Sequence, residues 1–377
     1  MNSRDRGSRI LVVGAGVSGL AAARSLVRSG FRPEVVERSS VANTEGTGVY
    51  LPGNAAQALR ALGLERDVIE RSVPIPAQRF HDFTGRLLGE VDVNDVWRDV
   101  GPCVGTSRSD LHTVLLAGAD GASIRSGVSP RALRSDDGGV HVEFGDGTAQ
   151  RYDLVVGADG IHSTVRRLMF GENAFARPVG QVGWRFVTER PSDVTTWSVL
   201  LGSRTAFLMV PISDDKLYCY CDVTGSSGAD TELDVAALFQ RFADPVPALA
   251  HFEARGEAVH QSVIEEVALD TWVRDRVVLI GDAAHATSPN MAQGAAMALE
   301  DAVVLPRCLA SHATITDALS AFEATRRPRT DWVRAQTHRR DRIRYLPRIV
   351  RNAALRTAGD KIYRSNYGPL LRPYLNS

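Results

Sequence analysis

Apolar positions along this chain follow two periods, and the change between them divides the sequence into two kinds of segment. Three short, almost wholly apolar runs end at Val13, Val156 and Ile280, and each leads into a turn that contains glycine. Runs of this kind are typical of strands buried on both faces, as in a parallel sheet. Because segments with helical spacing follow, we predict a parallel sheet covered by helices.

Residues 180–223 instead alternate apolar and polar positions in several runs, which indicates an antiparallel sheet. Residues 78–95 alternate on both sides of the pair Thr84-Gly85 and predict a hairpin. Ser107 or Ser109 is placed to cap a helix. From Ile315 onward the pattern is helical and basic, so we expect a helical C-terminal segment.

The turn after the first apolar run carries the pattern expected of a dinucleotide site. Gly14 would allow the tight turn, Gly16 would let the backbone approach a pyrophosphate, and Gly19 would let the next helix pack closely on the sheet. Glu37 lies 18 residues after Gly19, at the end of the next predicted strand, where an acid accepts ribose hydroxyls. The unpaired N–H groups at the start of the helix would face the phosphates.

Bulk properties restrict the class of partner. The chain has 377 residues, enough for two domains, and 44 basic residues balance 44 acidic ones. A formal net charge of zero argues against nucleic acid or an anionic membrane as the main partner. Neither a membrane-spanning run nor a signal peptide is visible, so we expect a cytoplasmic protein, monomeric or a homodimer.

The cysteines and the C-terminal arginines favour structural interpretations. Cys103, Cys219, Cys221 and Cys308 lack the spacing of a metal site and are interpreted as buried thiols, so no metal is expected. Ten arginines and two acids lie between residues 326 and 351. We favour a solvated helix whose arginines clamp nearby carboxylates, with an anionic partner site as the alternative.

Two further acids follow the other apolar runs. Asp159 and Asp282 each come directly after a strand, at the edge where open α/β sheets bind their ligands. A carboxylate there can accept from ribose or ribityl hydroxyls. The alternative for each is a structural one, capping of the following helix.

These motifs resemble those of the single-component, FAD-dependent aromatic hydroxylases, the family that contains para-hydroxybenzoate and salicylate hydroxylases. The resemblance rests on GAGVSG at the first turn, GADGIHSTVR from Gly157 and GDAAHATSPNMAQGAAMALEDA from Gly281. Weaker matches are TEGTGVYLPGNA, the arginine of SRSDLHTVL and FEATRRPR. One departure is Ala292, where many relatives have glycine; we regard it as conservative.

The resemblance implies an FAD site. Glu37 would hold the adenosine ribose, Arg38 would lie along the adenine, and Val128 would meet the adenine through its backbone. Arg108 would approach the pyrophosphate and ribityl region, Asp282 would bind the ribityl chain, and Asp159 would act indirectly by fixing its turn. Pro289 would lie above the flavin, whose pyrimidine end would face the N–H groups of the third motif's helix. The full implied set is Gly14, Ala15, Gly16, Ser18, Gly19, Glu37, Arg38, Arg108, Val128, Asp159, Asp282, Pro289, Gly294, Ala295 and Ala296.

The fold expected on this basis is α/β, with a Rossmann-like FAD-binding domain interleaved with an antiparallel β-sheet substrate domain and followed by a helical C-terminus. Residues 1–72, 100–175 and 266–312 would form the discontinuous FAD-binding domain. Residues 73–99 and 176–265 would form the substrate domain, and 313–377 the C-terminal helices.

The implied reaction is hydroxylation of an aromatic or heteroaromatic small molecule by NADH or NADPH and O2, through a hydroperoxide on the flavin C4a atom. Arg185 and Tyr218 are the candidate catalytic residues, although Arg185 could instead be solvated at a sheet edge. Phe207, Met209, Tyr220 and Pro289 are the candidate pocket residues, with core packing as the alternative for the first three. For His285 we favour a structural hydrogen bond over proton transfer.

Three alternatives stay open at this point. A flavin-dependent halogenase would share the fold, but none of the five tryptophans lies in a WxWxIP motif. An FAD-dependent epoxidase or reductase acting on a secondary metabolite is a second alternative. A flavin-binding sensor without catalytic activity is the third, and it would show no substrate-stimulated oxidation of NAD(P)H.

Overall fold

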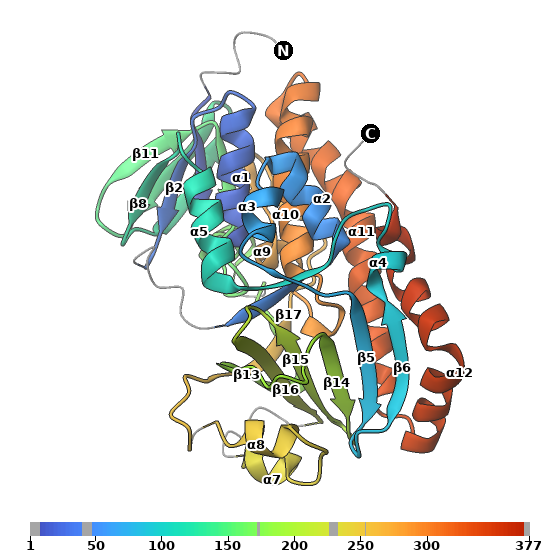
Figure 1. Ribbon diagram of the computed structural model, residues 1–377. Coiled ribbons are helices and arrows are strands. Elements are labelled where there is room, and N and C mark those ends of the chain that lie inside the picture. The colour runs from blue at the N-terminus through green and yellow to red at the C-terminus, as the bar shows by residue number, and fades with distance from the viewer. Residues whose placement is uncertain (1–7, 40–46, 172–173, 226–232, 253, 373–377) are drawn as a thin grey trace.

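The computed structural model describes residues 8–39, 47–171, 174–225, 233–252 and 254–372. A six-stranded sheet lies in the part of the molecule that is uppermost in Figure 1. The three predicted apolar runs are neighbours in this sheet, and all its strands are parallel except the short edge strand β18. Its order is β18 (Val273–Arg274), β19 (Val277–Leu279), β12 (Leu154–Gly157), β1 (Ile10–Val13), β2 (Glu34–Glu37) and β8 (Ser123–Ser126).

Helices cover this parallel sheet, as the predicted period requires. The main ones are α1 (Val17–Arg28), α5 (Arg108–Gly118) and α10 (Gly294–Ser311), and α1 packs against both of the others. Ser107 caps α5, since its side chain accepts from the N–H of Asp110 at 2.9 Å. The remaining helices of this part are α2 (Gly53–Leu62), α3 (Glu65–Ile69), α6 (Thr164–Phe170), α9 (Asp282–His285) and η2 (Pro289–Met291).

Two three-stranded sheets accompany the parallel sheet. One is a meander of β9 (Pro130–Asp136), β10 (Gly139–Phe144) and β11 (Ala149–Tyr152). The other has the order β3 (Gly48–Leu51), β7 (Val104–Ser107) and β4 (Val73–Pro74). The second sheet joins the two halves of the molecule: a Cβ on Gly105 would lie 2.1 Å from the carbonyl oxygen of Pro211.

A seven-stranded sheet forms the other half of the molecule. The predicted hairpin is present and belongs to this sheet, because β5 pairs in parallel with β14, while the other pairs are antiparallel. The order is β17 (His260–Glu266), β13 (Arg177–Glu189), β16 (Lys216–Thr224), β15 (Thr205–Pro211), β14 (Trp197–Leu201), β5 (Ala77–Asp82) and β6 (Leu87–Asp92).

The two faces of the seven-stranded sheet meet different parts of the chain. Its outer face packs under α7 (Val235–Phe239) and α8 (Val246–Ala250), which lie at the bottom of Figure 1. Its inner face meets the three-stranded sheet of β3, β7 and β4: a Cβ on Gly48 of β3 would lie only 2.3 Å from the Cβ of Tyr218 in β16. Residues far apart in sequence therefore meet between the two sheets.

The C-terminal part is helical, as predicted, and consists of α11 (Ile315–Ile343), α12 (Arg348–Tyr367) and η3 (Gly368–Leu371). Beside it, α4 (Val93–Val96) follows the hairpin. Arginines of this segment do clamp carboxylates, as expected: Arg334 binds Asp331, and Arg344, directly after α11, binds Asp222. The helix is not simply solvated, because Arg326 and Arg329 are buried where they bind Glu300. Among the described residues, no helix combines the length and apolar character needed to cross a bilayer.

Candidate functional site

The three motifs meet at one edge of the parallel sheet, where the strands β1, β12 and β19 end side by side. Gly14 has a φ of +106°, and a Cβ there would lie 2.5 Å from the carbonyl oxygen of Ala158 in the second motif. A Cβ on Gly19 would lie 1.8 Å from the carbonyl oxygen of Gly14. These two glycines let the first turn, the second motif and the helix come together.

The start of α1 has the properties of an anion site. Its N-cap, Gly16, supplies no side chain, and a Cβ on Gly16 would have nothing within 4 Å. The space above this backbone is therefore open, and the first N–H groups of the helix point into it. Ala15 is buried beside it, and Ser18 lies directly under Gly281 of the third motif.

The end of β2 lies next to this helix start. The Glu37 carboxylate accepts from the backbone N–H of Ala15 at 2.8 Å and of Ser39 at 3.0 Å, while Arg38 beside it is exposed. Val128 donates its N–H to the carbonyl oxygen of Glu37 at 2.9 Å. That N–H is thus engaged, so a backbone contact of Val128 with an adenine would have to use its carbonyl oxygen.

Asp159 of the second motif holds its own turn. Its carboxylate accepts from the Ser163 hydroxyl at 2.5 Å and from the N–H groups of Thr164 at 2.6 Å and Val165 at 3.1 Å. Burial raises the pKa of this carboxyl, although these donors oppose the shift. Asp159 therefore caps the region where α6 begins, as the structural alternative for this residue predicted, and in doing so it fixes its own turn.

Asp282 differs from Asp159 because its carboxylate is exposed and, within the described part of the chain, has no hydrogen-bond partner. A Cβ on Gly294 would lie 3.8 Å from its Oδ1 atom, so the carboxylate lies close to the start of α10. The helix α10 has no side-chain cap, which leaves the N–H groups at Gly294, Ala295 and Ala296 as donors at that end. The N–H donors at the start of α10 and the acceptor carboxylate of Asp282 thus lie side by side.

The loop between these groups contains a strained residue. Ala292 has a φ of +50°, in the left-handed region that a Cβ disfavours by about 1 kcal/mol. Replacing glycine by alanine here is therefore not the conservative change expected from the sequence. Pro289 begins the 3-10 turn η2 just before it, and this turn is half-buried.

The charged network behind α10 is buried, which was not anticipated from the sequence. Glu300 accepts from Arg326 at 2.5 Å, from Arg329 at 2.7 Å and from Asn54 of α2 at 2.9 Å. Asp301 accepts from Arg326 at 2.7 Å, from His285 at 2.7 Å and from the N–H of Gly281 at 2.9 Å. Two acids in an otherwise apolar helix were the available signal, since buried carboxylates need partners.

This network fixes the third motif. Burial raises the pKa of the Glu300 and Asp301 carboxyls, but the arginines, with His285 at Asp301, outweigh it and hold both pKa values below their ordinary range. His285 therefore makes a structural hydrogen bond, as favoured from the sequence. Because Asp301 also binds Gly281, the backbone beside Asp282 is held in place.

The inner face of the seven-stranded sheet brings together the polar residues expected there. Arg185 donates to the Ser262 hydroxyl at 2.7 Å, and its guanidinium lies 5.2 Å from the ring centre of Tyr220. In the register, Arg185 lies directly between Tyr220 and His260, so the three side chains share a face. Tyr218 is two residues from Tyr220 and lies on the same face.

Two arginines dominate the electrostatics around His260 and Tyr218. Burial lowers the pKa of His260, and the positive charges of Arg185 and Arg108 lower it further. Burial raises the pKa of Tyr218, while the same two arginines oppose that shift. Arg108 is the exposed first residue of α5, so it reaches this face from the other half of the molecule. His260 was not singled out from the sequence.

Phe207 and Met209 lie on the outer face, which corrects their assignment to the pocket. Both are buried, and Phe207 packs edge-on against Phe186 and against Phe239 of α7. Their register partners Cys221 and Cys219 lie on that face too, buried as expected. The sequence showed that residues of β15 alternate between two faces, but it did not show which residues of β16 share a face with Phe207 and Met209.

A polar bridge ties the third motif to the inner face. The Asp341 carboxylate, near the end of α11, accepts from Gln181 of β13 at 2.7 Å and from the side chain of Asn290. Burial raises the pKa of Asp341. Arg344, one turn further on, pairs with Asp222 of β16. The loop that carries Pro289 is thereby held against the sheet that carries Arg185.

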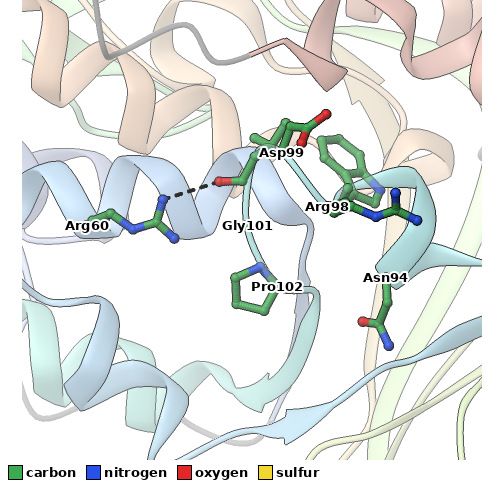
Figure 2. A pocket seen from close by; sticks show the side chains of 8 residues that line it. Arg60, Asn94, Arg98, Asp99, Gly101 and Pro102 are labelled. Carbon is green, nitrogen blue, oxygen red and sulfur yellow. Dashed lines mark hydrogen bonds between the residues drawn. The ribbon is translucent and has the colours of Figure 1, made fainter.

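A surface hollow of about 400 Å³ lies apart from these residues (Figure 2). It is lined by Arg60, Asn94, Trp97, Arg98, Asp99, Val100, Gly101 and Pro102. Arg60 donates across it to the carbonyl oxygen of Val100 at 3.4 Å and also pairs with Glu65. None of the site residues above lines it, so we assign it no part in the chemistry. Among the described residues, no three His, Cys, Asp or Glu side chains gather as metal ligands.

Comparison with known proteins assigns the family. The profile of the FAD binding domain family matches residues 8–337. The chain belongs to this family. It is 35% identical over 339 residues to 2-heptyl-3-hydroxy-4(1H)-quinolone synthase of Pseudomonas aeruginosa, with 87% of each chain covered. It is 31% identical over 327 residues to aurachin C monooxygenase/isomerase of Stigmatella aurantiaca, with 85% of each covered.

The fold agrees with this assignment. The crystal structure of HpxO from Klebsiella pneumoniae, solved with FAD and uric acid, superposes with a TM-score of 0.88 at 25% identity and covers 99% of this chain and 100% of its own. The protein is an FAD-dependent monooxygenase, and the predicted family, cofactor and fold class are confirmed. Its own residues fit FAD: the glycine turn is open at Gly16, α1 and α10 begin without side-chain caps, and Asp282 is unpartnered within the described chain.

Proposed function

We propose that this monooxygenase hydroxylates a fused N-heteroaromatic ring of the 4-quinolone type, with NADH or NADPH as reductant and O2 as the second substrate. The observation that carries the proposal is the position of Arg185 on the inner face, flanked by Tyr220 and His260. The relatives named for a quinolone and for aurachin C support the choice of ring system.

Arg185 has the chemistry to hold an electron-rich ring. Its guanidinium is oriented by Ser262 and by the Tyr220 ring, so it is presented in a defined plane. A ring oxygen placed against it would have its negative charge stabilised, which favours the deprotonated, electron-rich form of the ring whose adjacent carbon attacks. Arg108 adds a second positive charge to the same surface.

His260 and Tyr218 complete the surface. The lowered pKa of His260 favours the neutral imidazole, which can accept a proton from a ring N–H or O–H. The raised pKa of Tyr218 keeps its hydroxyl protonated and able to donate. Pro289, in the loop tied to the sheet through Asp341, would cover the ring from the other side.

When bound, FAD supplies electron transfer to O2 and delivery of the oxygen atom. The chain's part is to hold FAD through the groups around Gly16, Glu37, Asp282 and Gly294. The hydrogen bonds of Asp341 to Gln181 and Asn290 hold the third motif, and with it the groups around Asp282 and Gly294, against the sheet that carries the inner face. The exposed Asp282 carboxylate fits ribityl hydroxyls because it is the free acceptor beside the free donors of α10.

The test uses the purified FAD-loaded enzyme and a substrate panel. Oxidation of NADH and NADPH, O2 uptake and product mass are followed with 4-quinolones that carry or lack a 2-alkyl chain, and with urate and 6-hydroxynicotinate. We expect the 4-quinolones to stimulate oxidation most and to yield a product with one added oxygen atom derived from O2. Stronger stimulation by 6-hydroxynicotinate, which has a single ring, contradicts the proposal. So does the absence of stimulation by every compound in the panel.

A further inference from the structure

The turn between α11 and α12 exposes a cluster of large apolar side chains. Tyr345 is 53% exposed, Leu346 44%, Ile349 85% and Val350 54%. These four residues, called here the 345–350 patch, follow one another within two turns of chain. Scattered single apolar residues are normal on a surface, whereas a contiguous group of this kind marks a site of interaction.

Arginines surround the 345–350 patch. Residues 339–356 contain seven arginines and one acid, Asp341. Three of the arginines point inward, because Arg340 binds Tyr367, Arg344 binds Asp222 and Arg351 binds the carbonyl oxygen of Gly202.

Exposed arginines remain at the edge of the patch. Arg342 is exposed and precedes the patch in the chain, and the guanidinium of Arg204 lies 5.7 Å from the ring centre of Tyr345. Arg348 is exposed too and lies within the patch, with its guanidinium 4.8 Å from the ring centre of Phe83. The zero net charge of the whole chain therefore does not describe this end of the molecule. The patch presents apolar side chains in the middle and positive charge around them.

We propose that the 345–350 patch is a docking surface for an anionic lipid bilayer. Apolar side chains that enter the boundary between headgroups and acyl chains, flanked by arginines that meet lipid phosphates, are the chemistry of a protein that lies on a membrane without crossing it. The patch lies at the end of the molecule where α12 begins, beside the β5–β6 hairpin at the lower right of Figure 1.

A second copy of this chain fits the patch less well. A two-fold interface centred on the patch brings each surface against its own copy, so the arginines around one patch face the arginines around the other. Such like-charge contacts oppose association. An anionic bilayer meets the same arginines with opposite charge, which is why the charge pattern selects it.

The test is sedimentation of the FAD-loaded full-length enzyme with two kinds of vesicle: phosphatidylcholine alone, and a mixture in which about a third of the lipid is phosphatidylglycerol. We expect binding to the anionic vesicles only, weakening as salt is raised. Arg342→Ala should weaken binding about fivefold. The double variant Ile349→Ser with Val350→Ser should weaken it about tenfold.

Two controls match these changes. Phe175→Ser removes a side chain that is 52% exposed outside the patch, and Arg32→Ala removes an exposed arginine far from it in sequence. Both should bind vesicles as the unaltered enzyme does, and all variants should retain the flavin absorbance. No binding to anionic vesicles, equal binding to both kinds, or equal losses in the controls overturns the proposal. So does a dimer that the double variant dissociates while vesicle binding is unchanged.

Discussion

The two faces of the seven-stranded sheet are made by the same strands, and yet they differ in kind. The outer face carries Phe186, Phe207 and Met209, all buried, which pack under α7 and α8. The inner face carries Arg185, Tyr220 and Asp222, which are held by partners from other strands and helices. Alternation along one strand therefore separates residues that stabilise the fold from residues that form the site.

This difference predicts how substitutions divide between stability and activity. The apolar outer face contributes burial and close packing, so substitutions on this face should lower the free energy of unfolding. A polar inner face gains little stability from its charged groups, because removing them from water is costly. Substitutions on the inner face should therefore lower the catalytic activity.

The largest expected effect is on the outer face. Phe207→Ala should lower the free energy of unfolding by about 3–5 kcal/mol, because it empties a fully buried ring position between Phe186 and Phe239. Denaturant titration of the FAD-loaded enzyme measures the loss. Leu208→Ala, one residue along and on the partly exposed inner face, is the matched control and should cost less. Equal losses would show that the two faces do not differ in packing.

Arg185→Met tests the inner face. We expect kcat/KM for the best substrate to fall about 100-fold, the size of effect seen when one preorganised donor to a developing oxyanion is lost. The free energy of unfolding should change by less than about 1 kcal/mol. Arg177→Met, at an exposed position of the same strand, should leave kcat/KM unchanged. A loss of stability that matches the loss of activity would instead make Arg185 a structural residue.

Tyr220→Phe, unlike the substitutions above, should increase the stability of the protein. The Tyr220 hydroxyl is buried and has no hydrogen-bond partner in the described structure, so its removal should raise the free energy of unfolding by about 1 kcal/mol. Tyr152→Phe is the matched control: its hydroxyl donates to Glu34 at 2.8 Å, so the same change there should be destabilising. If Tyr220 binds substrate, KM should rise while stability improves, a combination that a purely structural tyrosine would not give.

Sequence reasoning succeeded where local pattern determines structure. Periodicity and turn chemistry predicted the strands that end at Val13, Gly157 and Leu279, each within one residue of the end of its apolar run. They also predicted the hairpin at Thr84-Gly85 and the capping by Ser107. The convergence of the ends of β1, β12 and β19 followed from the rule that open α/β sheets bind ligands at the carboxyl ends of their strands.

It failed where the answer depends on how separate segments meet. The face occupied by Phe207 and Met209 depends on the register between strands, which no single strand records. The φ of Ala292 depends on the loop that closes over α10, so alanine there looked harmless. The partners of Glu300 lie on α2 and α11, and His260 gains its meaning only from Arg185 on the neighbouring strand.

The smallest expected effect concerns pH and separates the faces once more. The titratable groups of the outer face include Cys219 and Cys221, whose pKa values burial raises well above the ordinary range, so they do not titrate near neutrality. Asp341, at the edge of the inner face, has a raised pKa because it is buried. Its protonated form is therefore favoured in the folded state.

From this shift the sign follows: the stability associated with protonated Asp341 is fully present below about pH 4, the pKa of an aspartate in the unfolded chain, and is lost as the pH rises through the higher folded value. Asp341→Asn keeps an oxygen that accepts from Gln181 and Asn290 but cannot ionise. We expect its Tm, relative to that of the unaltered enzyme, to rise between pH 4 and pH 7 by about 1–2 °C. Asp99→Asn, at an exposed aspartate, should show no such trend. A flat difference would mean that Asp341 has the same pKa in the folded and unfolded chain, and a falling one that the fold stabilises its charged form; either result contradicts the raised pKa.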